Sequence, residues 1–368
     1  MNRDVIVVGA GVIGCAVAWE LARRGVPVEI VDDRPVGMGA TQASAGVLAP
    51  YIEAREGSPL LDLTTRSLDL YENFMTRLRS ESGINVPYRR TGTIEVAFDD
   101  DDVLAMRTTL DVLSRRGVTA RMLDAAETAA EEPLLSKHAI ASLVIYDHGF
   151  VAAGELTRAL VTAARRHGAQ LVEQTRVRRI IASPQDVTIE TDRGSLTANA
   201  VVIAAGSWSG EIIVAGFAAR LPVRPVRGQL LYAALEGASL RRVTWSSRCY
   251  MVPWDDGTVL VGATVEEAGF DERVTFAGVR DLIDAACDLV PHAWAAALRG
   301  TRVGLRPATS DDLPVIGPSS GAANVIYATG HYRNGILLAP LTAQLVADAL
   351  ENRLDPMLAP VSPARFGL

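Results

Sequence analysis

The chain has 368 residues, of which 49% are hydrophobic and 21% charged, and its formal net charge is −7. This composition is typical of a two-domain soluble α/β enzyme, and its acidic balance implies no basic face for nucleic acid. It contains no apolar run of the ~18–20 residues that a membrane helix needs, and its three widely spaced cysteines suggest neither a disulfide framework nor a metal site. Because the N-terminus enters a strand with no leader pattern, we expect a cytoplasmic protein.

The first predicted elements are a strand, a glycine-rich turn, a helix and a second strand. Val5–Val8 is a run of apolar residues that suits a strand buried on both faces of a parallel sheet. Residues 12–24 predict a helix that Gly25 ends, and Val28–Val31 predicts the second strand. The turn between the first strand and the helix carries glycines in the spacing GxGxxG: Gly9, Gly11 and Gly14.

This turn predicts a dinucleotide site. Gly9 permits the tight turn, Gly11 lets a phosphate approach the backbone, and Gly14 allows the helix to pack closely on the sheet. The helix N-terminus offers N–H groups and the positive end of its dipole to a pyrophosphate. Asp32 closes the second strand, where an acidic residue is expected to take the ribose hydroxyls.

The rest of the sequence alternates between helical and strand patterns. Helical periodicity recurs at 60–82, 101–116, 154–168, 275–290 and 335–350. Strand patterns recur at 94–98, 195–210, 221–265 (successive antiparallel strands) and 324–330. They predict an α/β (α+β two-domain) fold, with a Rossmann-like FAD-binding domain in discontinuous segments (1–85, 140–215 and 300–368) and an antiparallel-sheet substrate-binding domain (86–139 and 216–299).

FAD explains the sequence better than NAD. Glycine-rich loops follow strand-like sequence at 36–46, 204–210 and 330–335, and a nicotinamide enzyme gives no reason for them. FAD is longer, and its isoalloxazine must be enclosed by later parts of the chain. The helix that begins at Gly335 could face the flavin N1–C2=O edge and stabilise the negative charge of reduced flavin.

Five motifs resemble the D-amino-acid oxidase superfamily of flavoproteins and, more narrowly, the bacterial glycine oxidases of thiamine biosynthesis: VIVVGAGVIGCAVAWELARRG, ATQASAGVLAP, CYMVP with VLVGAT, GLRPATSDDLPVIG and ATGHYRNGILLAP. The resemblance covers nearly the whole chain. It implies oxidative deamination of glycine or another small amine-bearing acid by hydride transfer to flavin N5. It also implies reoxidation by O2 to give H2O2, a role in supplying imine for thiamine thiazole synthesis, and a homotetramer.

The resemblance also implies site residues. Arg306, in GLRP, matches the arginine that clamps the substrate carboxylate, a role that suits a planar guanidinium. Tyr250 matches a tyrosine whose hydroxyl supports that carboxylate, and Arg333 matches a residue near substrate and flavin. We expect Cys249, beside Tyr250 but of opposite alternation, to belong to the core.

The expected FAD site combines the turn glycines, the three loops and positions matched to the family. Within it, the backbone of Val177 is expected at the adenine, and His331 is expected to be a hydrogen-bond partner rather than an acid or base. The set is Gly9, Gly11, Val12, Ile13, Gly14, Asp32, Asp33, Ala40, Thr41, Ala45, Gly46, Val47, Val177, Ala205, Gly206, His331, Arg333, Asn334, Gly335, Ile336 and Leu337.

Flavin attachment is expected to be non-covalent. The related sarcosine oxidase branch attaches flavin through a cysteine just after the equivalent of Arg306 and uses a lysine near the flavin. Here Pro307 and Ala308 follow that arginine, and Lys137, the only lysine, lies in a predicted surface insertion.

Departures from the glycine-oxidase pattern leave the substrate open. Val47 and Val265 stand where the family can carry methionines, and Arg248 stands where a histidine can occur. A larger pocket would admit sarcosine, D-alanine or D-proline. Two other functions also remain: a dehydrogenase that passes electrons to a quinone or partner protein, and a non-catalytic FAD-binding subunit of a heteromeric oxidase.

Overall fold

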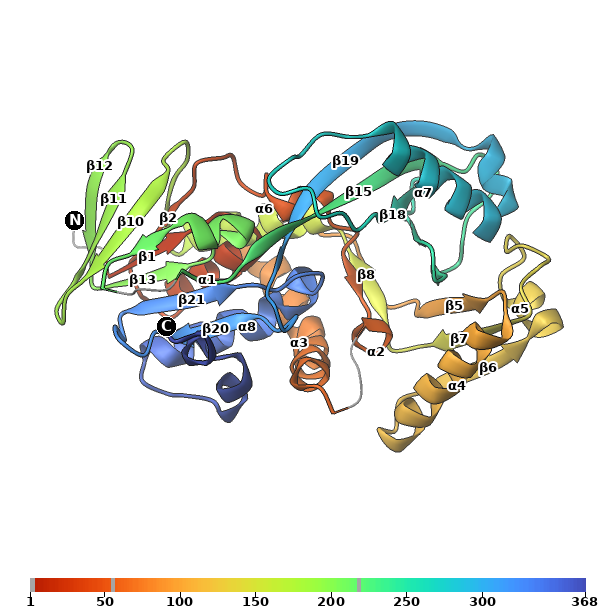
Figure 1. Cartoon of the computed structure of the whole chain (residues 1–368), viewed down its shortest axis with the longest axis horizontal. Coiled ribbons are helices and arrows are strands. Elements are labelled where there is room, and N and C mark those ends of the chain that lie inside the picture. The colour runs from red at the N-terminus through yellow and green to blue at the C-terminus, as the bar shows by residue number, and fades with distance from the viewer. Residues whose placement is uncertain (1–3, 54–56, 217–219) are drawn as a thin grey trace.

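A six-stranded sheet forms the half of the molecule at the left of Figure 1. The structure, a computed structural model, describes residues 4–53, 57–216 and 220–368. The strand order is β20-β21-β13-β1-β2-β9, with β20 antiparallel to its neighbour and the other strands parallel. The strands are β1 (Val5–Val8), β2 (Val28–Val31), β9 (Gln170–Val172), β13 (Ala200–Ile203), β20 (Val315–Pro318) and β21 (Val325–Thr329).

Both faces of this sheet are covered, which explains why β1 is apolar throughout. Val5 and Val7 pack against the helices on one face, and Ile6 and Val8 pack against a four-stranded sheet on the other, because side chains alternate along a strand. The helices are α1 (Val12–Arg23), α3 (Pro59–Ser82), α6 (Ala153–Arg166) and α8 (Gly335–Leu350). The four strands, in the order β12-β11-β10-β14, are β10 (Val177–Ala182), β11 (Val187–Thr191), β12 (Gly194–Ala198) and β14 (Ile213–Val214).

An eight-stranded sheet forms the other half, at the right of Figure 1, in the order β19-β15-β18-β17-β16-β5-β7-β6. Its pairs are antiparallel except for β16 and β5. The strands are β5 (Thr93–Ala97), β6 (Ala120–Asp124), β7 (Ala141–Ile145), β15 (Arg224–Ala234), β16 (Val243–Trp245), β17 (Tyr250–Pro253), β18 (Thr258–Gly262) and β19 (Ala297–Ala308). Its helices are α4 (Asp100–Arg115), α5 (Ala125–Glu131) and α7 (Phe276–Leu289).

Short elements complete the described chain. A three-stranded sheet contains β3 (Val47–Leu48), β8 (Gly149–Val151) and β4 (Tyr88–Arg89), and α2 (Pro50–Glu53) follows β3. The 3-10 helices are η1 (Ala40–Ala43), η2 (Gly206–Glu211), η3 (Pro291–Ala295), η4 (Pro356–Val361) and η5 (Pro363–Phe366).

The fold class is confirmed, and one predicted element is wrong. The segment 195–210 is not a single strand, because β12 and β13 belong to different sheets. The chain changes sheet at Asn199, whose side-chain amide donates to Asp4 at 3.0 Å. The domain division stays a prediction; β7, at the start of the segment 140–215, pairs within the eight-stranded sheet.

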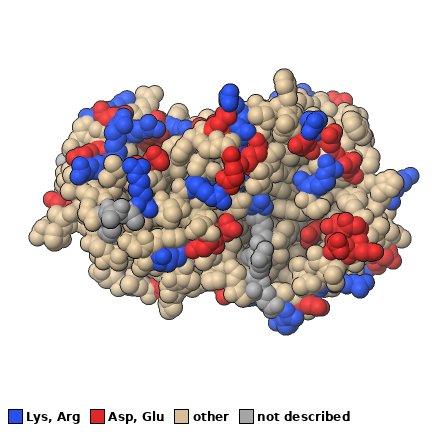
Figure 2. All heavy atoms as spheres, in the orientation of Figure 1, with Lys and Arg blue, Asp and Glu red and all other residues tan. Residues whose placement is uncertain are grey.

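The surface mixes both signs of charge. Figure 2 shows basic and acidic side chains interspersed over the face in view. Within the described ranges, every helix is too short or too polar to cross a membrane.

Candidate functional site

One cavity of about 890 Å³ joins the glycine-rich turn to the eight-stranded sheet. Its lining includes Gly9 and Gly11 of the turn, Asp32 after β2, and both Tyr250 and Arg306 of the sheet. The volume lies in the range of ~300–1,000 Å³ typical of small-molecule and cofactor sites. A ligand that binds at the turn can therefore extend to side chains of the other half of the molecule.

The turn leaves room for a phosphate at one glycine only. A Cβ on Gly9 would lie 2.4 Å from the Ala204 carbonyl oxygen, and one on Gly14 would lie 1.8 Å from the Gly9 carbonyl oxygen. These two glycines therefore pack against protein backbone. A Cβ on Gly11 would meet only the Thr41 hydroxyl, at 3.4 Å, so the open side of the turn is at Gly11.

Asp32 holds the turn as well as facing the cavity. Its Oδ2 accepts from the Ala10 N–H at 2.6 Å, and its Oδ1 accepts from the Arg34 N–H at 2.8 Å. Burial raises the pKa of Asp32, and these two backbone donors act in the opposite direction. A carboxylate has about four acceptor positions, so both oxygens keep the capacity to accept from ribose hydroxyls.

The loop after β2 returns to the start of α1. The Val12 N–H, in the first turn of α1, donates to the Thr41 hydroxyl at 3.1 Å. Gly46 follows with φ 71°, and a Cβ there would lie 1.8 Å from the Val151 carbonyl oxygen. Both the left-handed conformation and the contact require glycine. The loop is thereby fixed along the cavity wall.

The N-terminus of α8 opens on the same cavity. Asn334, Gly335 and Ile336 line it, together with His331. His331 is buried, its Nε2 lies 3.0 Å from the Thr342 hydroxyl, and burial lowers its pKa to about 3. The imidazole is therefore neutral at physiological pH, and its role as a hydrogen-bond partner rather than an acid or base stays a prediction.

The side chain of Arg306, in β19, lies over Gly228 of the neighbouring strand β15. Its Nη1 donates to the Thr264 carbonyl at 2.9 Å and to the Arg227 carbonyl at 3.4 Å. A Cβ on Gly228 would stand 2.3 Å from Nη2 and 2.5 Å from both Cζ and Nη1. The guanidinium therefore occupies the space that a side chain at position 228 would fill.

The Tyr250 side chain likewise lies over a glycine of the sheet, Gly262. It pairs with Gly262 across β17 and β18, and a Cβ on Gly262 would lie 2.5 Å from the tyrosine hydroxyl. Gly262 in turn pairs with Leu230 of β15, two residues beyond Gly228. Residues two apart share a face of a strand, so Arg306 and Tyr250 lie over the same face.

The other predicted substrate-side residues also line the cavity. The guanidinium of Arg333, an exposed residue, lies 5.2 Å from the ring of Tyr332. Val47, Val265 and Arg248 are in the lining, and Val265 is 53% exposed. Cys249 is buried in the core of the sheet, as expected, although it also belongs to the cavity lining.

Two members of the predicted cofactor set do not line the cavity. Gly14 packs under the turn, and Leu337, in the first turn of α8, is buried in the core. The other members do line it: Gly9, Gly11, Val12, Ile13, Asp32, Asp33, Ala40, Thr41, Ala45, Gly46, Val47, Val177, Ala205, Gly206, His331, Arg333, Asn334, Gly335 and Ile336.

Three aromatic residues of the lining were missed by the sequence analysis. Trp245 packs on Tyr250 with ring centroids 4.7 Å apart, and the short hairpin that pairs them was the available signal. Trp208 lies 5.7 Å from Phe270, and the Arg34 guanidinium lies 4.2 Å from the Trp208 ring. These residues come from distant segments, so spacing alone gave no signal for them.

The residues present fit an FAD molecule laid along this cavity. The open turn at Gly11 and the N-terminus of α1 suit the pyrophosphate, and Asp32 suits a ribose. Val177 belongs to the segment beside Asp32, because the Thr175 N–H donates to the Asp32 carbonyl at 2.9 Å, whereas the loop before Gly335 lies beside Arg306, because the Tyr332 N–H donates to the Pro307 carbonyl at 2.9 Å. We therefore propose that the adenosine lies at the end of the cavity beside β2 and that the flavin lies at the end beside α8.

Known proteins resemble the chain along almost all of its length. A family model described as FAD dependent oxidoreductase (DAO) matches residues 4–349. The glycine oxidase of Geobacillus kaustophilus is 35% identical over 365 residues, which covers 98% of this chain and 97% of that protein. A crystal structure of glycine oxidase from the same species matches with a TM-score of 0.94 at 34% identity, covering 98% of each chain. The bifunctional protein ThiO/ThiG of Trichormus variabilis is 33% identical over 373 residues, covering 100% of this chain and 55% of that protein.

Proposed function

This chain belongs to the FAD-dependent oxidoreductases of the D-amino-acid oxidase family, and we propose that it oxidises glycine or another small amine-bearing acid. The observation that carries the proposal is the placement of Arg306 and Tyr250. Both lie over one face of the sheet, above Gly228 and Gly262, in the cavity that begins at the dinucleotide turn. The likeness to glycine oxidases supports the same substrate class.

In this proposal Arg306 binds the substrate carboxylate. A guanidinium can present two parallel N–H donors to a carboxylate, which fixes both the position and the orientation of a small acid. The Tyr250 hydroxyl supports the same carboxylate, and Trp245 packs on the tyrosine ring. With only Cα and an amine beyond its carboxylate, glycine is then oriented entirely by this end of the molecule, and proximity supplies much of the catalysis.

The chain needs no general base for this chemistry. Bound FAD would accept a hydride from Cα at N5 and transfer the electrons to O2, giving H2O2 and an imine that hydrolyses to a keto acid and ammonia. The neutral substrate amine provides the lone pair, so the protein must only hold the acid and exclude water. His331 stays neutral and bonded to Thr342, and it serves as a fixed polar wall.

The cavity supports a substrate range wider than glycine. Val47 and Val265 present short side chains to it, so sarcosine, D-alanine and D-proline belong to the proposed range. A supply of imine to thiamine thiazole synthesis is proposed from the ThiO/ThiG likeness. Non-covalent FAD is proposed because Pro307 and Ala308 follow Arg306, and the homotetramer stays a prediction by analogy.

Aerobic turnover tests the proposal. With glycine we expect O2 uptake, with H2O2, glyoxylate and ammonia released in equal amounts. Rapid reduction of an artificial quinone with little O2 uptake would instead favour the dehydrogenase, and no turnover with any of the four amino acids would favour the non-catalytic subunit.

A further inference from the structure

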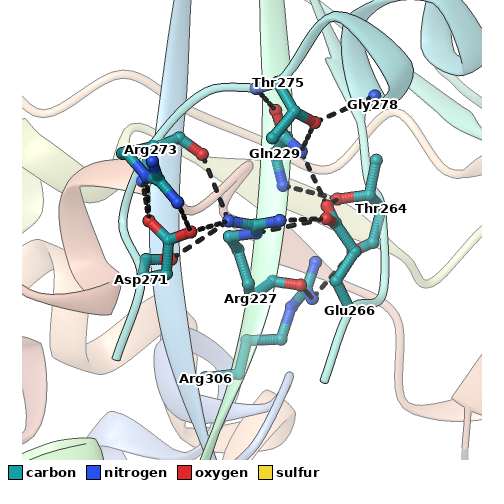
Figure 3. Close-up of polar contacts among 9 residues, drawn as sticks. All are labelled: Arg227, Gln229, Thr264, Glu266, Asp271, Arg273, Thr275, Gly278 and Arg306. Atoms are coloured by element: carbon teal, nitrogen blue, oxygen red, sulfur yellow. Dashed lines mark hydrogen bonds and ion pairs between the residues drawn. The ribbon is translucent and has the colours of Figure 1, made fainter. Parts of the chain in front are cut away.

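A polar cluster anchors the loop 263–275, which joins β18 to α7 (Figure 3). Its central members form what we call the anchor cluster: Arg227, Gln229, Thr264, Glu266 and Asp271. Arg227 and Gln229 belong to β15, and the other three belong to the loop. The loop also lines the cavity, through Ala263 and Val265 among others.

Glu266 is the acceptor at the centre of the cluster. Its Oε2 accepts from Arg227, from Nη2 at 2.6 Å and from Nε at 3.1 Å. Its Oε1 accepts from the Gln229 amide at 2.7 Å and from the Thr264 hydroxyl at 2.5 Å. Burial by itself would raise the pKa of Glu266, but the donors together hold it below its ordinary value. The carboxylate is therefore ionised and bound on both oxygens.

Arg227 is a buried cation that needs these partners. Its side chain is 8% exposed, and it pairs with Asp271 at 3.0 Å as well as with Glu266. A buried charge is stable only when it is paired and hydrogen-bonded. The backbones of Arg227 and Glu266 also pair, with N···O distances of 2.9 and 3.0 Å. The cluster therefore ties the loop to β15 by side chain and main chain together.

The anchor cluster also contacts Arg306. The two carbonyls that accept from its Nη1 belong to Thr264 and Arg227, which are both members of the anchor cluster. The Thr264 hydroxyl, on the side chain of that residue, donates to Glu266 and accepts from the Gln229 N–H at 2.9 Å. Hydrogen bonds to its side chain thus fix Thr264 in place, while its carbonyl accepts from the Arg306 guanidinium.

We propose that Glu266 is a positioning residue, which acts through Thr264 and Arg227 to aim the Arg306 guanidinium at the substrate carboxylate. The inference rests on the proposed function, because it assigns to Arg306 the carboxylate of an amino acid. It extends the carboxylate site from the arginine to a loop contact that lies outside the cavity lining. Gly228 completes the arrangement by leaving the space in which the guanidinium lies.

The test compares Glu266→Ala with Glu267→Ala in the FAD-loaded protein. Glu267 is the matched control, because it lies in the same loop and pairs with Arg224 of the same strand, but that pair is exposed and exposed pairs contribute little. The first readout is the Kd for acetate, a carboxylate without an amine, measured from the perturbation of the flavin absorbance. The second is kcat/KM for glycine and for glycine ethyl ester, whose carboxyl end is uncharged.

Glu266→Ala should weaken acetate binding roughly tenfold or more, since a displacement of about 1 Å can cost ~100-fold. It should lower kcat/KM for glycine by a similar factor while leaving the ester within about threefold of its wild-type value, and Glu267→Ala should change neither. Equal losses on glycine and ester, or wild-type acetate binding, would overturn the positioning role. If the wild-type protein itself neither binds acetate nor oxidises glycine, the proposed function is wrong and the inference falls with it.

Gly228→Ala tests the same geometry without removing a buried charge partner. The three atoms nearest to the new Cβ would all belong to the end of the Arg306 side chain, which can move aside, so the melting temperature should stay near that of the wild type. Acetate affinity should fall as for Glu266→Ala. A normally folded Gly228→Ala variant with wild-type acetate affinity would contradict the inference, even if Glu266→Ala failed to fold.

Discussion

Replacing Gly11 with alanine should separate cofactor binding from folding. Gly11 has φ −72° and ψ 179°, an extended conformation that any residue adopts. The added Cβ would meet the Thr41 hydroxyl at 3.4 Å, which is an ordinary van der Waals contact. The apoprotein should therefore fold normally, while the methyl group stands where a phosphate would approach the turn.

The expected magnitudes differ for the two properties. Glycine-to-alanine changes without strain stabilise by about 0.4–1 kcal/mol, because the unfolded chain loses freedom. For FAD, displacement of the phosphate from one backbone N–H should cost the ~1.5–3 kcal/mol of a hydrogen bond to a charged group, or roughly 10- to 150-fold in Kd.

The assay measures both properties on the apoprotein. Urea unfolding gives its stability, and quenching of flavin fluorescence during titration gives the Kd for FAD. Gly14→Ala is the contrasting variant, because its Cβ would lie 1.8 Å from the Gly9 carbonyl oxygen and should destabilise even the apoprotein. Wild-type FAD affinity in Gly11→Ala would refute the placement of the phosphates at this turn.

Three further predictions follow from the site and the core. Arg306→Ala should lower kcat/KM for glycine by about 2–5 kcal/mol, roughly 30- to 5,000-fold, as expected for loss of a buried charge partner; near-normal glycine kinetics would remove the carboxylate assignment. Val47→Met with Val265→Met should fill the cavity and lower kcat/KM for D-proline roughly tenfold relative to glycine, whereas an unchanged ratio of the two would show that these positions do not set the substrate range. Burial lowers the pKa of His148, which lies against Thr93, to about 3, so only the unfolded chain takes up that proton between about pH 6.5 and pH 3. The free energy of unfolding should therefore decrease as the pH is lowered from about 6.5 to 3, by up to about 1.4 kcal/mol per pH unit from this residue. Urea unfolding of His148→Gln at several pH values should show a weaker dependence of that free energy on pH, and an unchanged dependence would refute the prediction.

Local patterns predicted the elements that hold the cofactor end of the cavity. The turn glycines and the helical pattern of residues 12–24, which Gly25 ends, depend on neighbours in the sequence. The helix predicted at 335–350 coincides with α8 (Gly335–Leu350). Each of these features is specified within about one helix length, so sequence reasoning could find it.

The substrate end depends on contacts between distant segments. Arg306 and Gly228 are brought together by the pairing of β19 with β15, and Glu266 meets Arg227 from 39 positions away. From composition alone Arg306 is one arginine among many, and only the family resemblance singled it out. The sheet boundary at Asn199 was missed for the same reason, since its partner Asp4 is 195 positions away.

The most direct test of the central claim is anaerobic addition of glycine to the purified protein while its visible spectrum is recorded. We predict a yellow protein with flavin bands that bleach with glycine and return when air is admitted, with release of H2O2. Bleaching by sarcosine, D-alanine or D-proline but not by glycine would keep the fold and the carboxylate site and change the substrate. Flavin bands that none of these amino acids bleaches would contradict the proposed function.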